Sequence, residues 1–115
     1  MPFLNLSTNV EVSKEQTSSL LHELSKLVAS ETGKPERYVM IDINGGRPML
    51  FAGTSEPLAY LECKSIGLSS SQSKSLSASL CHLMESRLGV AKDRIYIEFS
   101  NCPGEYWGWN GSTFS

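Results

Sequence analysis

The chain has 115 residues, with 10 Lys and Arg against 12 Asp and Glu, and its formal net charge is −2 at pH 7. This length fits one small domain, and the balanced charge, without a basic block or an acidic tail, does not indicate nucleic acid or an anionic membrane as a partner. No apolar run reaches the roughly 18 residues of a membrane span and no signal-peptide pattern is present, so we expect a cytosolic protein without membrane insertion.

The first half of the chain has the pattern of a strand, a helix and a second strand. Residues 3–10 (FLNLSTNV) alternate apolar and polar side chains, and Ser13 and Gln16 have the spacing of a capping box at a helix start. Apolar side chains then recur at helical spacing: Leu20, Leu21, Leu24, Leu27 and Val28. Gly33 can adopt the left-handed conformation that ends many helices. Residues 37–43 (RYVMIDI) are rich in β-branched and aromatic side chains and predict a second strand.

The second half of the chain repeats this order. Residues 58–66 (LAYLECKSI) and 94–99 (RIYIEF) predict two more strands. Between them, Ser69 and Gln72 repeat the capping-box spacing, and a helical apolar stripe follows: Leu76, Leu80, Leu83, Met84 and Leu88. Matching landmarks lie about 55–57 positions apart: Pro2 and Pro57, Ser13 and Ser69, Gly33 and Gly89, and Arg37 and Arg94. The sequence therefore predicts two β-α-β units, with pseudo-repeats at about 1–55 and 56–115, in a single domain.

Two such units predict an α+β fold in which a four-stranded mixed sheet carries both helices on one face. Each crossover should be right-handed and should pair its two strands in parallel. The other face of the sheet is left bare, because residues 49–53 (MLFAG) and 106–114 (YWGWNGSTF) are long enough only for short edge strands. We therefore expect oligomerisation, with sheets packing on sheets and the short strands extending the edge of a neighbour's sheet.

Several polar groups are explained better by structure than by chemistry. His22 and His82 lie on predicted helices without metal-ligand spacing, so we expect no metal site. The serine-rich segment 69–79 lies at a helix start, where capping explains it. Residues 44–48 (NGGRP) lack the strand–loop–helix setting of a phosphate-binding loop and predict a turn. The three cysteines have no C-x-x-C spacing, which fits free thiols.

Pro2 has two interpretations. Proline lacks the N–H that a sheet ladder needs and is tolerated at the start of a strand, which explains Pro2 without any chemistry. Removal of Met1, however, would turn Pro2 into a terminal secondary amine. Such an amine can take a proton from carbon once its pKa is lowered by apolar surroundings or by a nearby cation. The candidates for these influences are the rings of Phe3, Trp107, Trp109 and Phe114 and the ammonium of Lys34.

Seven short motifs follow one another along essentially the whole chain. They are MPF at 1–3, TNV at 8–10, TGKP at 32–35, AGTSEP at 52–57, SIG at 65–67, DRIYIEF at 93–99 and GWNGSTF at 108–114. Together they resemble the macrophage migration inhibitory factor (MIF) family of the tautomerase superfamily. The resemblance implies a homotrimer in which the sheets form a central barrel, with an active site at each subunit interface. It also implies a keto–enol tautomerase of the phenylpyruvate or dopachrome type that uses no cofactor.

The resemblance also assigns roles to single residues. Pro2 is implied as the catalytic base, Lys34 as the cation that receives the carboxylate of a small aromatic α-keto acid or its enol, and Ile66 as a backbone contact. The pocket tyrosine, donated by the neighbouring subunit, corresponds to Tyr96. The rim that faces the substrate ring corresponds to Tyr38, Trp109 and Phe114.

The chain departs from the family pattern at several positions. Glu98 stands where the best-known members have a pocket asparagine, and Trp107 where they have a smaller aliphatic residue. Residues 58–61 (LAYL) replace the C-x-x-C of the vertebrate cytokine, so thiol oxidoreductase activity is not expected. These departures keep an alternative open: a MIF-like cytokine or immunomodulatory binding protein with vestigial tautomerase activity, secreted without a signal peptide and engaging a cell-surface receptor. The arginine and aspartate implicated in receptor engagement have no evident counterparts, which weakens that alternative.

Overall fold

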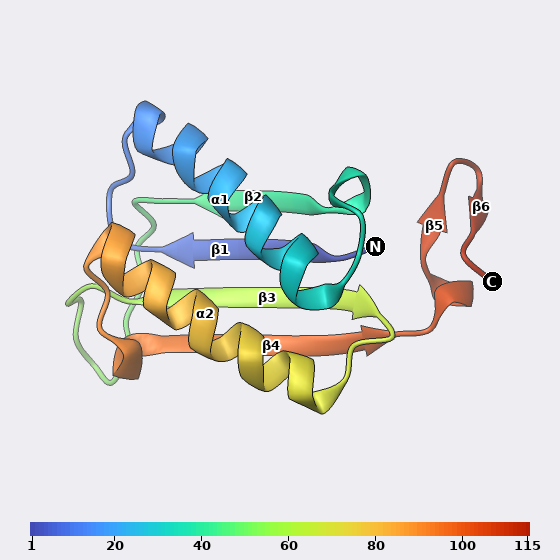
Figure 1. Cartoon of the computed structure of the whole chain (residues 1–115). Helices are drawn as coiled ribbons and strands as arrows, with labels where there is room; N and C mark the ends of the chain where they lie inside the picture. Colours follow the sequence, from blue (N-terminus) through green and yellow to red (C-terminus); the bar gives the residue numbers. More distant parts are fainter.

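A four-stranded sheet with two helices on one face forms the body of the protein in the computed structural model, which describes residues 1–115 (Figure 1). The strands are β1 (Phe3–Thr8), β2 (Met40–Asn44), β3 (Ala59–Ile66) and β4 (Ile95–Cys102), and the helices are α1 (Lys14–Thr32) and α2 (Ser70–Leu88). A small hairpin of β5 (Gly108–Trp109) and β6 (Ser112–Thr113) stands beyond one end of the sheet. Neither helix has the length and apolar character that a membrane span requires.

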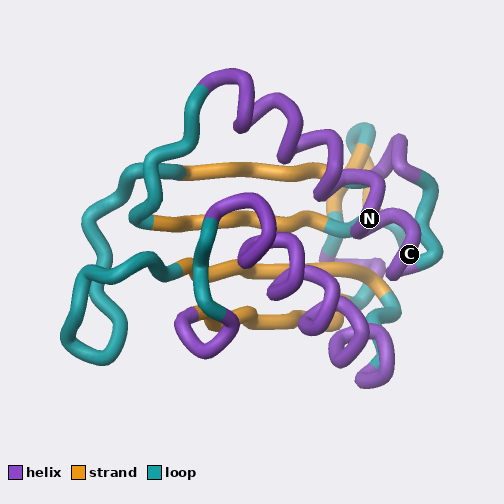
Figure 2. Tube along the Cα trace, turned by 60° about the vertical axis from the view of Figure 1, so that its left-hand side comes forward, coloured by secondary structure: helices purple, strands orange, loops and turns teal.

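The strand order confirms the predicted duplication. The order across the sheet is β2-β1-β3-β4, and each half of the chain contributes one parallel pair, β1 with β2 and β3 with β4. The two halves meet in the middle along the antiparallel pair of β1 and β3. Figures 1 and 2 show both helices on the same face of this sheet. The α+β fold predicted from the sequence is therefore confirmed.

Serine caps begin both helices, as the sequence predicts. The Ser13 side chain accepts a hydrogen bond from the backbone N–H of Gln16, and the Ser69 side chain accepts one from the backbone N–H of Gln72. The box is complete only in α2, where the Gln72 side chain accepts the Ser69 N–H at 2.9 Å. In α1 the Gln16 side chain turns to the other helix instead.

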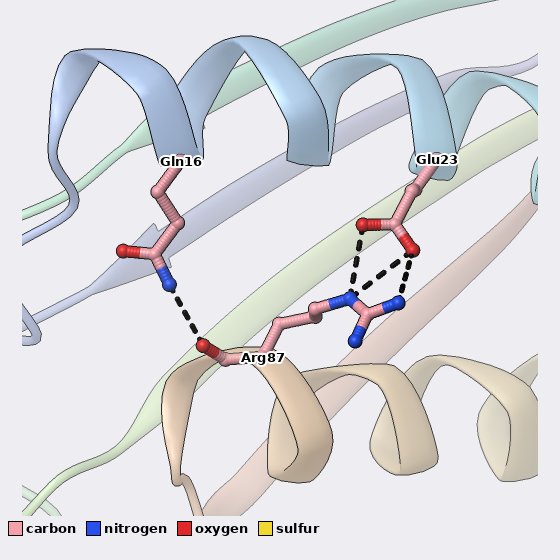
Figure 3. A network of polar contacts seen from close by, with 3 residues as sticks. All are labelled: Gln16, Glu23 and Arg87. Atoms are coloured by element: carbon pink, nitrogen blue, oxygen red, sulfur yellow. Dashed lines mark hydrogen bonds and ion pairs between the residues drawn. The ribbon is translucent and has the colours of Figure 1, made fainter.

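Contacts between the helix ends fix α1 and α2 to each other (Figure 3). The Gln16 side-chain amide donates to the carbonyl of Arg87 in the last turn of α2, and the Gln72 amide donates to the carbonyl of Thr32 in the last turn of α1. Each helix start thus satisfies a C-terminal carbonyl of the other helix, which otherwise lacks an intrahelical partner. The Arg87 guanidinium also donates to both carboxylate oxygens of Glu23, and this contact lowers the pKa of the Glu23 carboxyl.

The core lies between the helices and one face of the sheet. It is a cluster of 16 buried residues that includes Leu4 and Leu6 of β1, Leu61 of β3 and Met84 of α2. Alternate residues of the same strands point to the opposite face, which no element of the chain covers. Two large apolar side chains on that face, Met40 and Tyr96, are 65% and 66% exposed. The predicted bare face is therefore present.

One buried polar atom has no partner. The Ser65 hydroxyl, on the helix-facing side of β3, lies in a side chain that is 1% exposed and makes no hydrogen bond. Because a buried unpaired hydroxyl costs free energy, Ser65→Ala is expected to raise the free energy of unfolding by about 1 kcal/mol. Thermal unfolding followed by circular dichroism measures this change. The matched control is Ala59→Ser on the same face of β3, which is expected to lower the unfolding temperature. A lower unfolding temperature for Ser65→Ala would contradict the prediction.

Within one chain, the short strand predicted at residues 49–53 pairs with no other strand. Only one antiparallel bridge, from Phe51 to Thr54, is present, because Ala52 and Gly53 both adopt positive φ, 53° and 76°. The Arg94 guanidinium donates to four carbonyls between residues 51 and 57, those of Phe51, Thr54, Glu56 and Pro57. The predicted second strand is also shorter than expected, because residues 36–38 form a 3₁₀ turn before β2 begins.

Candidate active site

A cavity of about 380 Å³ encloses the start of the chain. Its walls come from segments far apart in the sequence: residues 1–3, residues 37–40 at the entrance to β2, Lys64 of β3, and residues between 107 and 114. Most of these side chains are apolar or aromatic, and no acidic side chain is among them. This size and lining are typical of a pocket for a small molecule.

Backbone pairing on both sides fixes Pro2 in the cavity. On one side β1 runs parallel to β2, and the Pro2 carbonyl accepts the Met40 N–H at 3.0 Å. On the other side Phe3 lies opposite Lys64 of β3. The Pro2 side chain is fully buried. The pairing of the Pro2 carbonyl and of Phe3 therefore positions Pro2 at the cavity.

Three aromatic rings form one wall of the cavity. Tyr38 lies edge-on to Trp109 and to Phe114, with ring centroids 5.6 and 6.0 Å apart. Trp109 and Phe114 stack with their centroids at 5.6 Å. The β5–β6 hairpin that carries them is anchored because the Phe114 N–H donates to the carbonyls of Gly104 and Trp107. These contacts bring the end of the chain against its beginning.

Positive charge surrounds the chain start. Burial lowers the pKa of the Met1 α-amino group, and the nearby Lys34 ammonium lowers it further. Both effects disfavour the protonated amine. Two other cations, Arg37 and Lys64, line the cavity itself. No group of three His, Cys, Asp or Glu side chains is arranged to hold a metal ion anywhere in the chain.

The family model described as Macrophage migration inhibitory factor (MIF) matches residues 1–115. The chain belongs to this family. Among curated MIF proteins, that of Meriones unguiculatus is 38% identical over 116 residues, covering 100% of both chains. The MIF homolog of Trichuris trichiura is 39% identical over 115 residues, covering 99% of this chain and 100% of its own.

Solved structures of MIF homologues share the fold. The structure of the homologue from Prochlorococcus marinus has a TM-score of 0.93 at 45% identity and covers 98% of this chain and 99% of its own. That of the Trichinella spiralis protein has a TM-score of 0.88 at 35% identity and covers 97% and 99%. These two matches show that the chain has the MIF fold. Their sequence identities of 45% and 35% agree with its membership of the MIF family.

The residues that the MIF resemblance assigns to the site are partly together in the structure. Five of them line the cavity: Pro2, Tyr38, Trp107, Trp109 and Phe114. Lys34 is half-buried and does not line the cavity, although its charge acts on the N-terminus. Ile66 ends β3 two residues beyond Lys64, on the same face of the strand.

Tyr96 and Glu98 lie elsewhere in the chain. Tyr96 packs against Phe51, with ring centroids 4.7 Å apart, in a separate apolar hollow. Glu98 accepts a hydrogen bond from the Tyr60 hydroxyl at 2.9 Å on the bare face. Burial, this bond and the charges of Glu62 and Glu98 together raise the pKa of Tyr60 to about 12. Within one chain, neither Tyr96 nor Glu98 reaches the cavity.

Sequence reasoning missed Arg37 and Lys64 as cavity residues. Arg37 served only as a landmark of the duplication, and a 3₁₀ turn places it at the cavity. Lys64 enters through the antiparallel register of β1 and β3, which sets it opposite Phe3. A signal for Lys64 existed in the alternation of β3, because Lys64 shares a face with Ile66.

Proposed function

We propose that the protein is a keto–enol tautomerase of the phenylpyruvate type, with L-dopachrome isomerisation as a related activity, and that the Pro2 amine is its catalytic base. One observation carries the proposal: Pro2 is fully buried at a mostly apolar cavity, with an aromatic wall beside it and the charge of Lys34 acting on the chain start. Membership of the MIF family, whose resemblance implies this chemistry, supports it.

The base becomes available only when Met1 is removed. While Met1 is attached, the nitrogen of Pro2 is an amide and has no useful basicity. The Met1 amine already has a lowered pKa from burial and from Lys34. An amine at position 2 would lie in the same cavity, where burial and the charge of Lys34 would act on it in the same direction. We therefore expect the terminal Pro2 amine to be a free base near neutral pH.

The reaction moves one proton within the substrate. With the keto form bound, the Pro2 nitrogen takes a proton from the carbon next to the ketone, so a C–H bond breaks and an enolate forms. The resulting ammonium then gives the proton to the enolate oxygen, where an O–H bond forms. Lys34 would hold the substrate carboxylate, and either Lys34 or the backbone at Ile66 would donate to the developing oxyanion. The aromatic wall would receive the substrate ring.

We further propose that the working enzyme is a homotrimer with sites shared between subunits. Ser100 of β4 pairs with Lys64, which lines the cavity. Within one chain Tyr96 lies four residues before Ser100, a distance of about 13 Å along β4. Tyr96 is nevertheless 66% exposed beside an apolar hollow. A neighbouring copy that covers the bare face would bury this side chain and could present it to the next cavity.

The pH profile of the reaction tests the role of the Pro2 amine. Activity should rise as pH increases through the pKa of that amine, because only the free base accepts a proton. Lys34→Gln removes a positive charge that disfavours the ammonium, so the pKa should rise and the acidic limb of the profile should move to higher pH. The measurement is kcat/KM for loss of phenylpyruvate enol absorbance between pH 4 and 9.

A matched control separates this effect from a general loss of charge. Lys26→Gln removes a lysine that is exposed on α1 and lies outside the cavity, so its pH profile should coincide with that of the unmodified protein. An acidic limb that stays in place in Lys34→Gln, whatever the height of the profile, would show that the base is not an amine next to Lys34.

A further inference from the structure

Arg37 and Lys64 are cations that the proposed reaction leaves without a role. The Arg37 side chain is exposed and makes no hydrogen bond or ion pair, since the only two ion pairs in the chain join Arg87 to Glu23 and Lys92 to Glu85. Its guanidinium carbon lies 4.9 Å from the centroid of the Tyr38 ring. Arg37 therefore stands against the aromatic wall with its donors free.

Lys64 approaches the cavity from the other side of β1. On the bare face its cross-strand neighbours are Phe3 on β1 and Ser100 on β4, neither of which carries a charge. Glu62 lies two residues before Lys64 on the same face of β3 and forms no ion pair with it. Because β2, β1 and β3 are consecutive strands, Arg37 and Lys64 flank the start of β1 from both sides.

A substrate with a single carboxylate leaves Arg37 and Lys64 without an anionic partner. The carboxylate of an α-keto acid would be matched by Lys34, whereas Arg37 and Lys64 would still face a mostly apolar cavity with no acidic side chain in its lining. A guanidinium presents a planar set of donors that suits a carboxylate, and a partly desolvated anion gains from each such charge-assisted contact.

We propose that Arg37 and Lys64 form a second anion subsite, and that the site prefers aromatic keto acids with a second carboxylate on the ring. This substrate class rests on the tautomerase proposed above. The keto acid end would lie at Lys34 and Pro2, the ring along the wall containing Tyr38, and the distal carboxylate at Arg37, with Lys64 adding positive potential. The para position of the ring is the natural place for that carboxylate, because it points away from the keto acid.

Tryptophan fluorescence gives a binding test that needs no turnover. The chain has two tryptophans, Trp107 and Trp109, and both line the cavity, so their emission reports on its occupant. The probes are phenylacetate and 4-carboxyphenylacetate, which differ by the distal carboxylate alone. We expect the diacid to bind at least about tenfold more tightly at low salt, and this preference to shrink as ionic strength increases.

Substitutions test whether Arg37 and Lys64 cause the preference for the diacid. In the double variant Arg37→Gln/Lys64→Gln, the ratio of the dissociation constants of phenylacetate and 4-carboxyphenylacetate should fall toward one. Each single variant should lose part of the preference for the diacid. The control Lys26→Gln should keep the full preference. A ratio near one in the unmodified protein would overturn the proposal, and so would a ratio that survives the double variant.

Glu98 of a neighbouring subunit is an alternative anionic partner for Arg37 and Lys64. Glu98 lies two residues after Tyr96 on the same face of β4, so a neighbour that presents Tyr96 would bring this carboxylate nearby. It would then pair with Arg37 or Lys64 and repel a diacid. A diacid preference that appears only in Glu98→Gln would therefore overturn the subsite in the natural protein.

Turnover separates the subsite from the tautomerase itself. The substrates are the enols of phenylpyruvate and 4-carboxyphenylpyruvate, compared by kcat/KM. Selective diacid binding without turnover of either enol would support the subsite and overturn the tautomerase. Turnover of both enols with equal kcat/KM and equal binding of the two probes would support the tautomerase and overturn the subsite.

Discussion

Replacement of Pro2 by glycine is expected to lower kcat/KM for ketonisation of phenylpyruvate enol by about a hundredfold or more. The variant keeps a terminal amine but loses the ring that fills a fully buried position and fixes the nitrogen. A mobile primary amine then spends little of its time at the reacting carbon. A second variant, with an alanine inserted between Met1 and Pro2, keeps the ring and turns its nitrogen into an amide. It should be at least as inactive.

The duplication supplies a control for this experiment. Pro57 is the counterpart of Pro2 at the start of the second unit, is exposed, and has no free amine at any stage. Pro57→Gly should therefore retain the activity of the unmodified protein. Intact mass of each preparation shows whether Met1 has been removed. If wild-type protein that lacks Met1 ketonises phenylpyruvate enol no faster than Pro2→Gly does, Pro2 is not the base.

The fold could be predicted from the sequence because its signals are local and occur twice. Ser13 and Ser69 cap the helices, and Gly33 and Gly89 end them with φ of 70° and 68°. A pattern that recurs after about 56 residues is strong evidence for two copies of one unit. The turn at residues 51–54 could not be predicted from local sequence alone, because Arg94, more than 40 residues away, donates to the carbonyl of Phe51.

The candidate site could be predicted only in part, because it is assembled by long-range contacts. The sequence itself made Pro2 a candidate base, with Lys34 as the neighbouring charge, and the family resemblance added Tyr38 to the aromatic wall. The position of Lys64 at the cavity depends on the register of β1 against β3, and that of Arg37 on the 3₁₀ turn before β2. Strand patterns predict which face a residue occupies, whereas register depends on packing across the whole sheet. Tyr96 raises a harder problem, since no contact within one chain brings it to the cavity.

Mixed trimers test whether Tyr96 acts across a subunit boundary. Pro2→Gly chains and Tyr96→Ala chains are each expected to form nearly inactive trimers. When the two are co-expressed in equal amounts, however, some sites should combine an intact Pro2 from one chain with an intact Tyr96 from its neighbour. Random assortment gives each site this combination about one time in four, so about a quarter of the unmodified activity should return. The measurement is the rate of phenylpyruvate enol ketonisation per trimer, after size-exclusion chromatography has shown that trimers form.

The matching control uses two residues that are proposed to act from the same chain. The charge of Lys34 lowers the pKa of the Met1 amine within one subunit, so Pro2 and Lys34 belong to the same side of the proposed site. Mixing Pro2→Gly with Lys34→Gln can therefore never restore a site that has both groups. Rescue by Tyr96→Ala together with no rescue by Lys34→Gln would identify the neighbour as the donor of the tyrosine. If neither mixture exceeds the summed activity of its parents, each cavity works within its own chain, and the exposure of Tyr96 needs another explanation.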